Sequence, residues 1–177
     1  DLKTRFLAES LFIRAHYFYH LVQQFGDIPM PLKPTNSVET TAHKTKVDEV
    51  WNQIVTDLEF AVENLPETYQ ASEFGHITKY AAMHHLSRVY LTLKRSDDDL
   101  KKALNYAEQV INSGKYSLVK SHAELWDINN KNNSEVLFSV LYTQNAELNG
   151  DGNTAHMYFC SAYSEEHPAV KRVIEYG

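Results

Sequence analysis

Two histidines at four-residue spacing are the first residues whose positions could support chemistry. His16 and His20 fall in a segment with a helical pattern, and i, i+4 spacing on a helix is the spacing of metal ligands. The intervening residues are Tyr17, Phe18 and Tyr19, so the glutamate of a His-Glu-x-x-His metalloprotease motif is missing. We therefore interpret both histidines as members of a polar or inter-helix stripe, and we expect no metal site.

No nucleophile stands at a recognisable spacing from a base. Ser134 and Cys160 lack the context of a nucleophile elbow. Glu165 and Glu166 are carboxylates of the kind that glycosidases use, but adjacency in sequence does not give their separation in space. The sequence therefore predicts no catalytic residue, and we expect no cofactor.

Aromatic and amide side chains gather toward the C-terminal end of the sequence. Sugars stack their C–H groups on flat aromatic faces and offer hydroxyls to nearby amides and carboxylates. Trp126 adjoins an asparagine-rich loop, although packing remains an alternative for it, whereas Trp51 falls on the apolar face of a helix and should be core. Other aromatics flank the Gly/Asn/Asp loop at 149–153. We predict ligand contacts from Trp126, Tyr142, Asn149, Asp151, Asn153 and Tyr158.

Composition places the chain among ordinary globular proteins. The 177 residues are 43% hydrophobic and 12% aromatic, which argues against disorder. The formal net charge of −6 argues against a nucleic-acid partner. A single cysteine, Cys160, excludes an internal disulfide. Because the sequence starts without methionine and stops among apolar residues, we expect a segment of a longer protein.

Apolar periodicity predicts four long helices in two antiparallel pairs, 2–25 with 46–65 and 78–94 with 98–113. Thr45 and Asp48 have the spacing of a capping box at the start of the second helix. The inner face of the first helix is expected to hold Leu7, Leu11, Phe18, Val22 and Phe25. The inner face of the fourth helix is expected to hold Leu100, Ala103, Leu104, Ala107, Val110 and Ile111.

The pattern changes after Gly114. Residues 115–177 read as a loop-rich region with one short helical turn between Ser121 and Trp126. Strand-forming residues over 135–142 predict a short strand. The fold class is therefore mainly α, with tetratricopeptide-like antiparallel helix pairs and a short strand and loops near the C-terminal end.

Five stretches in order resemble the SusD/RagB family of bacterial outer-membrane nutrient-binding lipoproteins. The first contains Phe-Gly-Asp-Ile-Pro at 25–29, the family's most characteristic string, and the last contains Asn-Asn-Ser-Glu at 132–135. Each is weak alone, but five in the same order make a specific match over roughly residues 5–142. The stretches are 5–30, 50–66, 78–91, 106–116 and 132–138.

The resemblance implies a helical fold with four tetratricopeptide-like helix pairs, of which this chain holds a part. Residues 1–177 would then belong to a single SusD-like domain. It also implies a non-enzymatic protein at the outer-membrane cell surface. Such a protein binds oligosaccharide or polysaccharide, in some members peptide, and passes it to a SusC-like TonB-dependent transporter. The lipid anchor would lie outside residues 1–177. No family binding motif falls on the six predicted contact residues.

Two other functions remain open at this stage. A tetratricopeptide-like scaffold could bind a protein or peptide in its groove, and binding of free oligosaccharide would separate this reading from a glycan receptor. The third possibility is a glycan hydrolase, which would show turnover abolished by changing one carboxylate.

Overall fold

The computed structural model describes residues 1–34, 36–38, 41, 43–127 and 129–141. All helices belong to one compact unit, residues 1–139, and of the second unit, 140–177, only Val140 and Leu141 are described. Four long helices in two pairs confirm the predicted helical architecture. They are α1 (Leu2–Phe25), α2 (Val47–Asn64), α3 (Lys79–Leu93) and α4 (Asp97–Asn112). Two short elements complete the series, the 3₁₀ turn η1 (Ala71–Glu73) and α5 (His122–Leu125).

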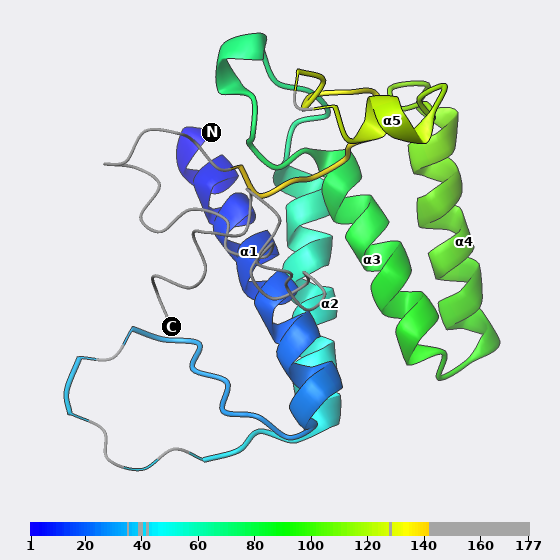
Figure 1. Cartoon of the computed structure of the whole chain (residues 1–177). Coiled ribbons are helices and arrows are strands. Elements are labelled where there is room, and N and C mark those ends of the chain that lie inside the picture. Colours follow the sequence, from blue (N-terminus) through cyan, green and yellow to red (C-terminus); the bar gives the residue numbers. More distant parts are fainter. Residues whose placement is uncertain (35, 39–40, 42, 128, 142–177) are drawn as a thin grey trace, which may run out of the picture. The chain divides into compact units, whose positions relative to one another are not determined.

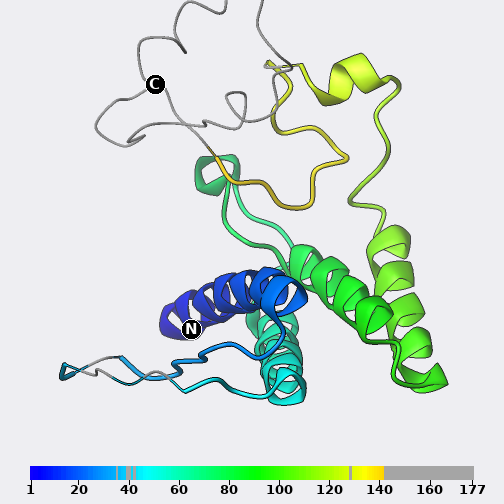
Figure 2. The ribbon, with the colours of Figure 1, turned by 60° about the horizontal axis from the view of Figure 1, so that its bottom comes forward.

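The four helices pack in chain order, each mainly against its neighbours (Figures 1 and 2). The core lies where α1, α2 and α3 meet, and its fully buried members include Phe12, Ile54, Leu58 and Leu86. Trp51 is buried there, as predicted. No helix in the described ranges combines the length and apolarity needed to cross a membrane.

Local sequence determines most of the helix ends. Thr78 and Ser96 accept hydrogen bonds from the backbone N–H groups three residues on, at the starts of α3 and α4. Gly26 ends α1 with a φ of 67°, a left-handed conformation that glycine adopts without strain. Asp97, Asp98 and Asp99 place negative charge at the positive end of the α4 dipole.

The predicted capping box at α2 is wrong. Thr45 instead pairs with Ile28 across the base of the 26–46 loop, where its N–H donates to the Ile28 carbonyl at 2.8 Å. Asp27 caps the helix from the other side of that loop, accepting the Val47 N–H at 2.9 Å. The cap therefore comes from a residue that is adjacent in space and distant in sequence.

The predicted inner faces are partly wrong. In α1, Leu7 and Phe25 are exposed, while Phe12 is buried, because α1 is apolar on more than one side and periodicity alone does not choose the packed side. In α4, Leu104 and Ile111 are exposed. Among the described elements α4 packs substantially only on α3. This contact buries only a narrow strip of α4 that contains Ala103 and Val110, so the other apolar residues of the predicted face are not covered.

The short strand predicted over 135–142 is also wrong for its described residues, 135–141, which are irregular. A strand needs a neighbouring edge with which to exchange hydrogen bonds. The segment before it makes only one backbone bond to the chain after α4, from the Ser117 N–H to the Ser134 carbonyl, and a turn follows at Val136. The predicted helical turn at Ser121 is confirmed as α5.

Candidate ligand-binding site

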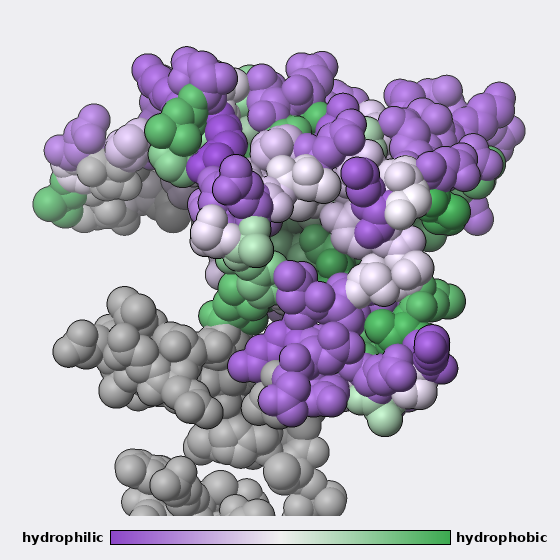
Figure 3. All heavy atoms as spheres, turned by 90° about the horizontal axis from the view of Figure 1, so that it is seen from above, coloured by the Kyte–Doolittle hydropathy of each residue, from purple (hydrophilic) through white to green (hydrophobic). Residues whose placement is uncertain are grey.

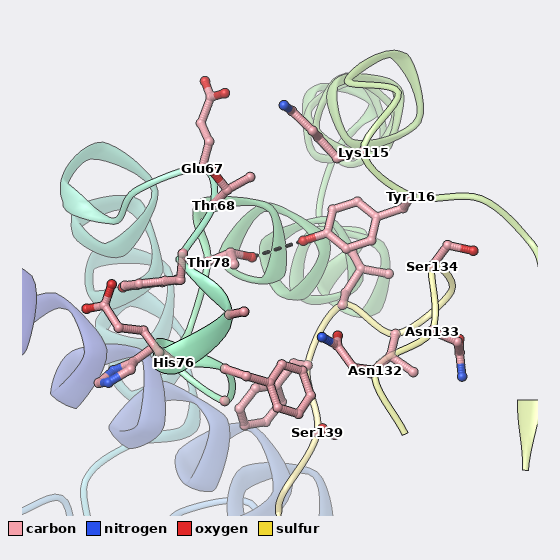
Figure 4. Close-up of a pocket in the computed structure, with 18 of the residues that line it drawn as sticks. Glu67, Thr68, His76, Thr78, Lys115, Tyr116, Asn132, Asn133, Ser134 and Ser139 are labelled. Atoms are coloured by element: carbon pink, nitrogen blue, oxygen red, sulfur yellow. Dashed lines mark hydrogen bonds between the residues drawn. The ribbon is translucent and has the colours of Figure 1, made fainter. Parts of the chain in front are cut away.

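A cavity of about 430 Å³ opens between three irregular segments at one end of the helices (Figure 4). Residues 67–78, which connect α2 to α3 and include η1, form one wall. Lys115 and Tyr116, just after α4, form the second, and residues 132–139 form the third. Hydrophilic side chains cover most of the surface seen from above, and hydrophobic ones emerge between them in separate groups (Figure 3).

The first wall is held against α1 by a charged network. The Tyr69 hydroxyl donates to the Glu9 carboxylate at 2.9 Å, and the Nδ1 atom of His76 lies 3.0 Å from both oxygens of the same carboxylate. The Tyr69 and His76 rings stack with centroids 5.2 Å apart. Arg5 donates to Glu73 at 3.1 Å. Burial, together with the Glu9 bond, raises the pKa of Tyr69, so its hydroxyl remains a donor at any physiological pH.

The second wall is bonded to both of the others, through Tyr116 to the first wall and through Ser117 to the third. Its hydroxyl hydrogen-bonds the Thr78 hydroxyl at 3.2 Å, and its ring meets Tyr80 edge-on with centroids 5.9 Å apart. The Ser117–Ser134 backbone bond, at 3.0 Å, then ties the 132–139 segment to the same strip of chain. Tyr116 is therefore fixed at two points, with Thr78 linking it to the start of α3.

Polar groups surround these aromatic walls. The amide of Asn132 points toward the cavity, whereas Glu67 and Lys115 extend from its rim (Figure 4). Within the described part of the chain the Asn132 side chain makes no hydrogen bond, in contrast to the neighbouring Asn133, which donates to the Asn130 carbonyl at 3.1 Å. Asn132 is thus a donor and an acceptor available to a ligand.

The cavity has the chemistry of a carbohydrate site. Four aromatic side chains line it together with amides and hydroxyls, which are the groups that stack on sugar rings and bind their hydroxyls. Of its acidic and basic side chains, Glu67 and Lys115 lie at the rim. His76 is bonded to Glu9, and Glu73 is bonded to Arg5. The four aromatic side chains are Tyr69, Phe74, Tyr116 and Phe138.

Only one of the six predicted contact residues lies in the described part of the chain. Trp126 is 73% exposed and does not line the cavity. Its indole N–H donates to the His122 imidazole at 2.9 Å, one helical turn back, which orients the ring. Tyr142, Asn149, Asp151, Asn153 and Tyr158 lie outside the described residues.

The residues that line the cavity were missed because their signals pointed elsewhere. Thr78 stands at the predicted start of the 78–94 helix, and Tyr116 follows Gly114, where the helical pattern ends. Asn132 belongs to the asparagine-rich loop already noted beside Trp126, and that loop was the nearest signal available. Only the fold brings the 67–78 connection, which is remote in sequence, opposite this asparagine-rich loop.

The histidines of α1 lie where α1 meets α3, and His16 also meets Phe138 of the cavity edge-on, with ring centroids 5.8 Å apart. His16 is half-buried, with its ring centroid 4.7 Å from that of His20 and 5.3 Å from that of His85. Among the residues that the structure describes, no three His, Cys, Asp or Glu side chains are arranged to hold a metal ion.

Comparison with known sequences decides the family. A SusD-like family model, described as starch-binding and associating with the outer membrane, matches residues 2–91. The chain belongs to the SusD-like family. This confirms the resemblance seen in the sequence, and it covers α1, α2 and most of α3.

Curated and structural relatives extend the match. The SusD-like protein P25 of Formosa agariphila is 27% identical over 135 residues, which is 76% of this chain and 25% of that protein. A SusD-like protein of Bacteroides ovatus is 28% identical over 155 residues, 78% of this chain and 26% of that protein. The chain thus spans about a quarter of the length of these relatives.

Solved structures share the fold. A structure with xylogluco-oligosaccharide superposes with a TM-score of 0.75 at 26% identity, over 80% of this SusD-like chain and 30% of the other. A laminarin-binding SusD-like protein gives a TM-score of 0.70 at 29% identity, over 79% and 31% respectively.

Proposed function

We propose that this chain is part of a cell-surface receptor that binds oligosaccharide without cleaving it. The observation that carries the proposal is the cavity beside Tyr116, where aromatic faces and the amide of Asn132 converge. Membership of the SusD-like family supports a glycan as the ligand, since two structural neighbours bear xylogluco-oligosaccharide or bind laminarin. We keep the Trp126 region and the aromatics around 149–153 as a second part of the proposed site.

The proposed binding mechanism uses stacking and hydrogen bonds. A sugar ring would lie against one of the aromatic side chains, and its edge hydroxyls would exchange hydrogen bonds with Asn132 and the rim residues. Of the carboxylates among the described lining residues, Glu67 extends from the rim and Glu73 accepts from Arg5, so they are not arranged as the facing acid and base that a glycosidase uses. The ligand would therefore leave unchanged.

Calorimetry with laminari- and xylogluco-oligosaccharides, alongside a reducing-end assay, tests the proposal. We expect binding without new reducing ends. Asn132→Ala should weaken oligosaccharide binding about tenfold, because it removes one or two hydrogen bonds to the ligand. Asn129→Ala is the matched control, because Asn129 is exposed in the same loop and does not line the cavity.

The outcomes separate the readings. Release of reducing ends would replace the receptor with a hydrolase. Binding that survives Asn132→Ala and is lost in Trp126→Ala or Tyr158→Ala would move the site to the region predicted from sequence. Absence of binding across a wider polysaccharide panel, with binding of peptides, would favour the scaffold reading.

We further propose that the complete protein is lipid-anchored at the outer membrane and passes its ligand to a SusC-like TonB-dependent transporter. Family membership supports this step, and the description of the family names the outer membrane. Cross-linking of the full-length protein in its own cells should recover a TonB-dependent transporter, identified by mass spectrometry. Recovery of the protein in the periplasm, with no transporter attached, would contradict it.

A further inference from the structure

A group of basic side chains lies where α1 meets α3, and one of them, His16, contacts Phe138 of the cavity wall with ring centroids 5.8 Å apart. We name this group the Arg88 patch. Arg88, His20 and His84 are exposed, His16 is half-buried, and His85 is buried. The patch is formed by His16 and His20 of α1 and by His84, His85 and Arg88 of α3.

The ring of Tyr19 is the centre of the patch. The guanidinium carbon of Arg88 lies 5.5 Å from its ring centroid, in cation–π contact. His20 and His85 meet the same ring edge-on, with centroids 5.5 and 5.0 Å away. The Tyr19 hydroxyl is held in turn by Thr92, at 3.2 Å. Arg88 is thus oriented by an aromatic face and keeps its N–H groups available.

Among the residues that the structure describes, no carboxylate pairs with Arg88. In the described ranges Arg88 takes part in none of the ion pairs, and its side chain donates no hydrogen bond. Two acids of the neighbouring helices are engaged elsewhere, since Glu9 holds His76 and Tyr69 while Asp57 accepts from Arg14 and Gln53. The patch is therefore a local excess of positive charge and N–H donors on a chain of net charge −6.

Burial and the neighbouring basic groups also lower the pKa values of histidines in the patch. Burial lowers the pKa of His16, and the nearby His20 and Arg88 lower it further. Burial, and then the charge of Arg88, also lower the pKa of His84. At neutral pH the imidazoles of His16 and His84 are therefore neutral, and each offers one N–H donor beside the fixed charge of Arg88.

These observations decide between a cation and an anion as ligand. The i, i+4 spacing of His16 and His20 would suit a metal, but Arg88 repels a cation, and the described residues supply no third metal ligand there. An anion that presents two oxygens side by side fits the guanidinium, which pairs with carboxylates and sulfates through two parallel N–H bonds.

We propose that the Arg88 patch binds a carboxylate or sulfate group of an acidic oligosaccharide. This proposal rests on the proposed function, in which the ligand is a glycan, and it specifies that the glycan carries a negative charge. Arg88 makes the bidentate contact, and His20 and His84, both exposed, donate from its sides. Because the whole chain is acidic, long polyanions are repelled at a distance, and the contact suits isolated charged residues on an otherwise neutral glycan.

Matched pairs of probes test the inference. An oligogalacturonate methyl-esterified at all but one residue is compared with its fully methyl-esterified form, and a carrageenan oligosaccharide that retains a single sulfate with its fully desulfated form, by calorimetry at low ionic strength. We expect the charged member of at least one pair to bind about tenfold tighter, the effect of one charge-assisted hydrogen-bonded pair. The pair that responds identifies carboxylate or sulfate as the group.

Two variants locate the effect. Arg88→Gln should abolish the preference for the charged member while leaving the affinity for the neutral member unchanged. Arg95→Gln is the matched control, because Arg95 is an exposed arginine beyond the end of α3 that bonds Asn52. His20→Asn, on the other helix, should reduce the preference without removing it, which keeps the test valid if Arg88→Gln does not fold.

Each outcome bears on one claim. Equal binding of charged and neutral members overturns the inference and leaves the receptor in place. An equal loss in Arg88→Gln and Arg95→Gln also overturns it, since the effect would then be a general charge effect. If neither member of either pair binds, and the neutral laminari- and xylogluco-oligosaccharides also fail, the proposed function falls and the inference with it.

Discussion

The guanidinium of Arg14 on α1 holds the buried carboxylate of Asp57 on α2 in a fork of two hydrogen bonds, at 2.7 and 2.6 Å. Asp57 is only 2% exposed, and Gln53 donates to the same carboxylate at 2.7 Å. The hydrogen bond to Asp57 raises the pKa of Arg14 above its ordinary value. A buried charge is thus satisfied by two helices, and the first helix pair is fixed in its register.

Removing one partner of this pair should destabilise the protein strongly. Arg14→Ala leaves the Asp57 carboxylate buried without its counter-charge, which costs about 3–5 kcal/mol. Urea denaturation measures the loss as a shift of the midpoint. Replacing both residues by apolar ones, Arg14→Met with Asp57→Leu, should recover most of it, because the desolvation penalty disappears together with the attraction.

Asp98→Asn is the control for this prediction. Asp98 pairs with Lys102 at 3.1 Å on the surface of α4, so its loss should cost less than about 1 kcal/mol. A cost for Arg14→Ala as small as that of Asp98→Asn would show that the buried pair contributes little.

Acid should destabilise the protein through His85. Burial first, and then its basic neighbours, lower the pKa of His85 to about 3, against 6.5 for an unperturbed histidine. Its neutral form is therefore favoured by folding, and this stability is complete above pH 6.5. It falls as the pH drops from 6.5 toward 3, because the unfolded chain takes up the proton first, by up to about 1.4 kcal/mol per pH unit.

The pH dependence can be assigned by comparing variants. The groups around His85 are Phe12, His16 and Tyr19 of α1, with His84 and Arg88 of α3. Unfolding free energies between pH 7.5 and 4.5 should fall less steeply in His85→Gln than in the parent. His43→Gln, at an exposed position in the 26–46 loop, should leave the slope unchanged, and a slope equally reduced there would remove His85 as the cause.

Loosening the first wall of the cavity should weaken ligand binding. Glu9→Gln removes the charge that holds both Tyr69 and His76, so the 67–78 connection loses its attachment to α1. We expect faster amide hydrogen exchange over 69–76, unchanged exchange in the centre of α2, and weaker binding of oligosaccharide. Glu49→Gln, an exposed glutamate on α2, makes the same chemical change without these contacts. Unaltered exchange in Glu9→Gln would show that the wall is held by other contacts.

The sequence was sufficient where the determining interactions are local. Periodicity placed all four helices to within about two residues, and Ser121 correctly indicated α5. It was insufficient where partners are far apart along the chain. Asp57 lies 43 residues from Arg14, and the helical pattern does not indicate that this charged residue is buried opposite an arginine.

The candidate site was less predictable than the fold for the same reason. Its walls come from three segments that lack a repeating pattern, and they meet only because α3 and α4 pack as a pair. Trp126 adjoins the asparagine-rich loop in the sequence, but the sequence does not show that the amide of Asn132 points toward the cavity. Residue type indicated the chemistry of the site, and the fold supplied its location.

The two candidate caps of α2 provide the sharpest test of local against long-range control. Asp27 accepts the Val47 N–H at 2.9 Å and pairs with Lys46 at 3.0 Å, and the Lys46 contact and the backbone bond lower the pKa of its carboxyl group. Asp27→Ala should therefore lower the melting temperature at pH 7 more than Thr45→Ala does, because Thr45 contributes a backbone bond that alanine retains. The stabilisation by Asp27 is complete above its unfolded pKa near 3.8 and is lost as the pH falls through the lower folded value, so the two variants should converge in acid. Thermal denaturation followed by circular dichroism at pH 7 and pH 3 measures both effects. A larger loss in Thr45→Ala would instead restore the local capping box read from the sequence.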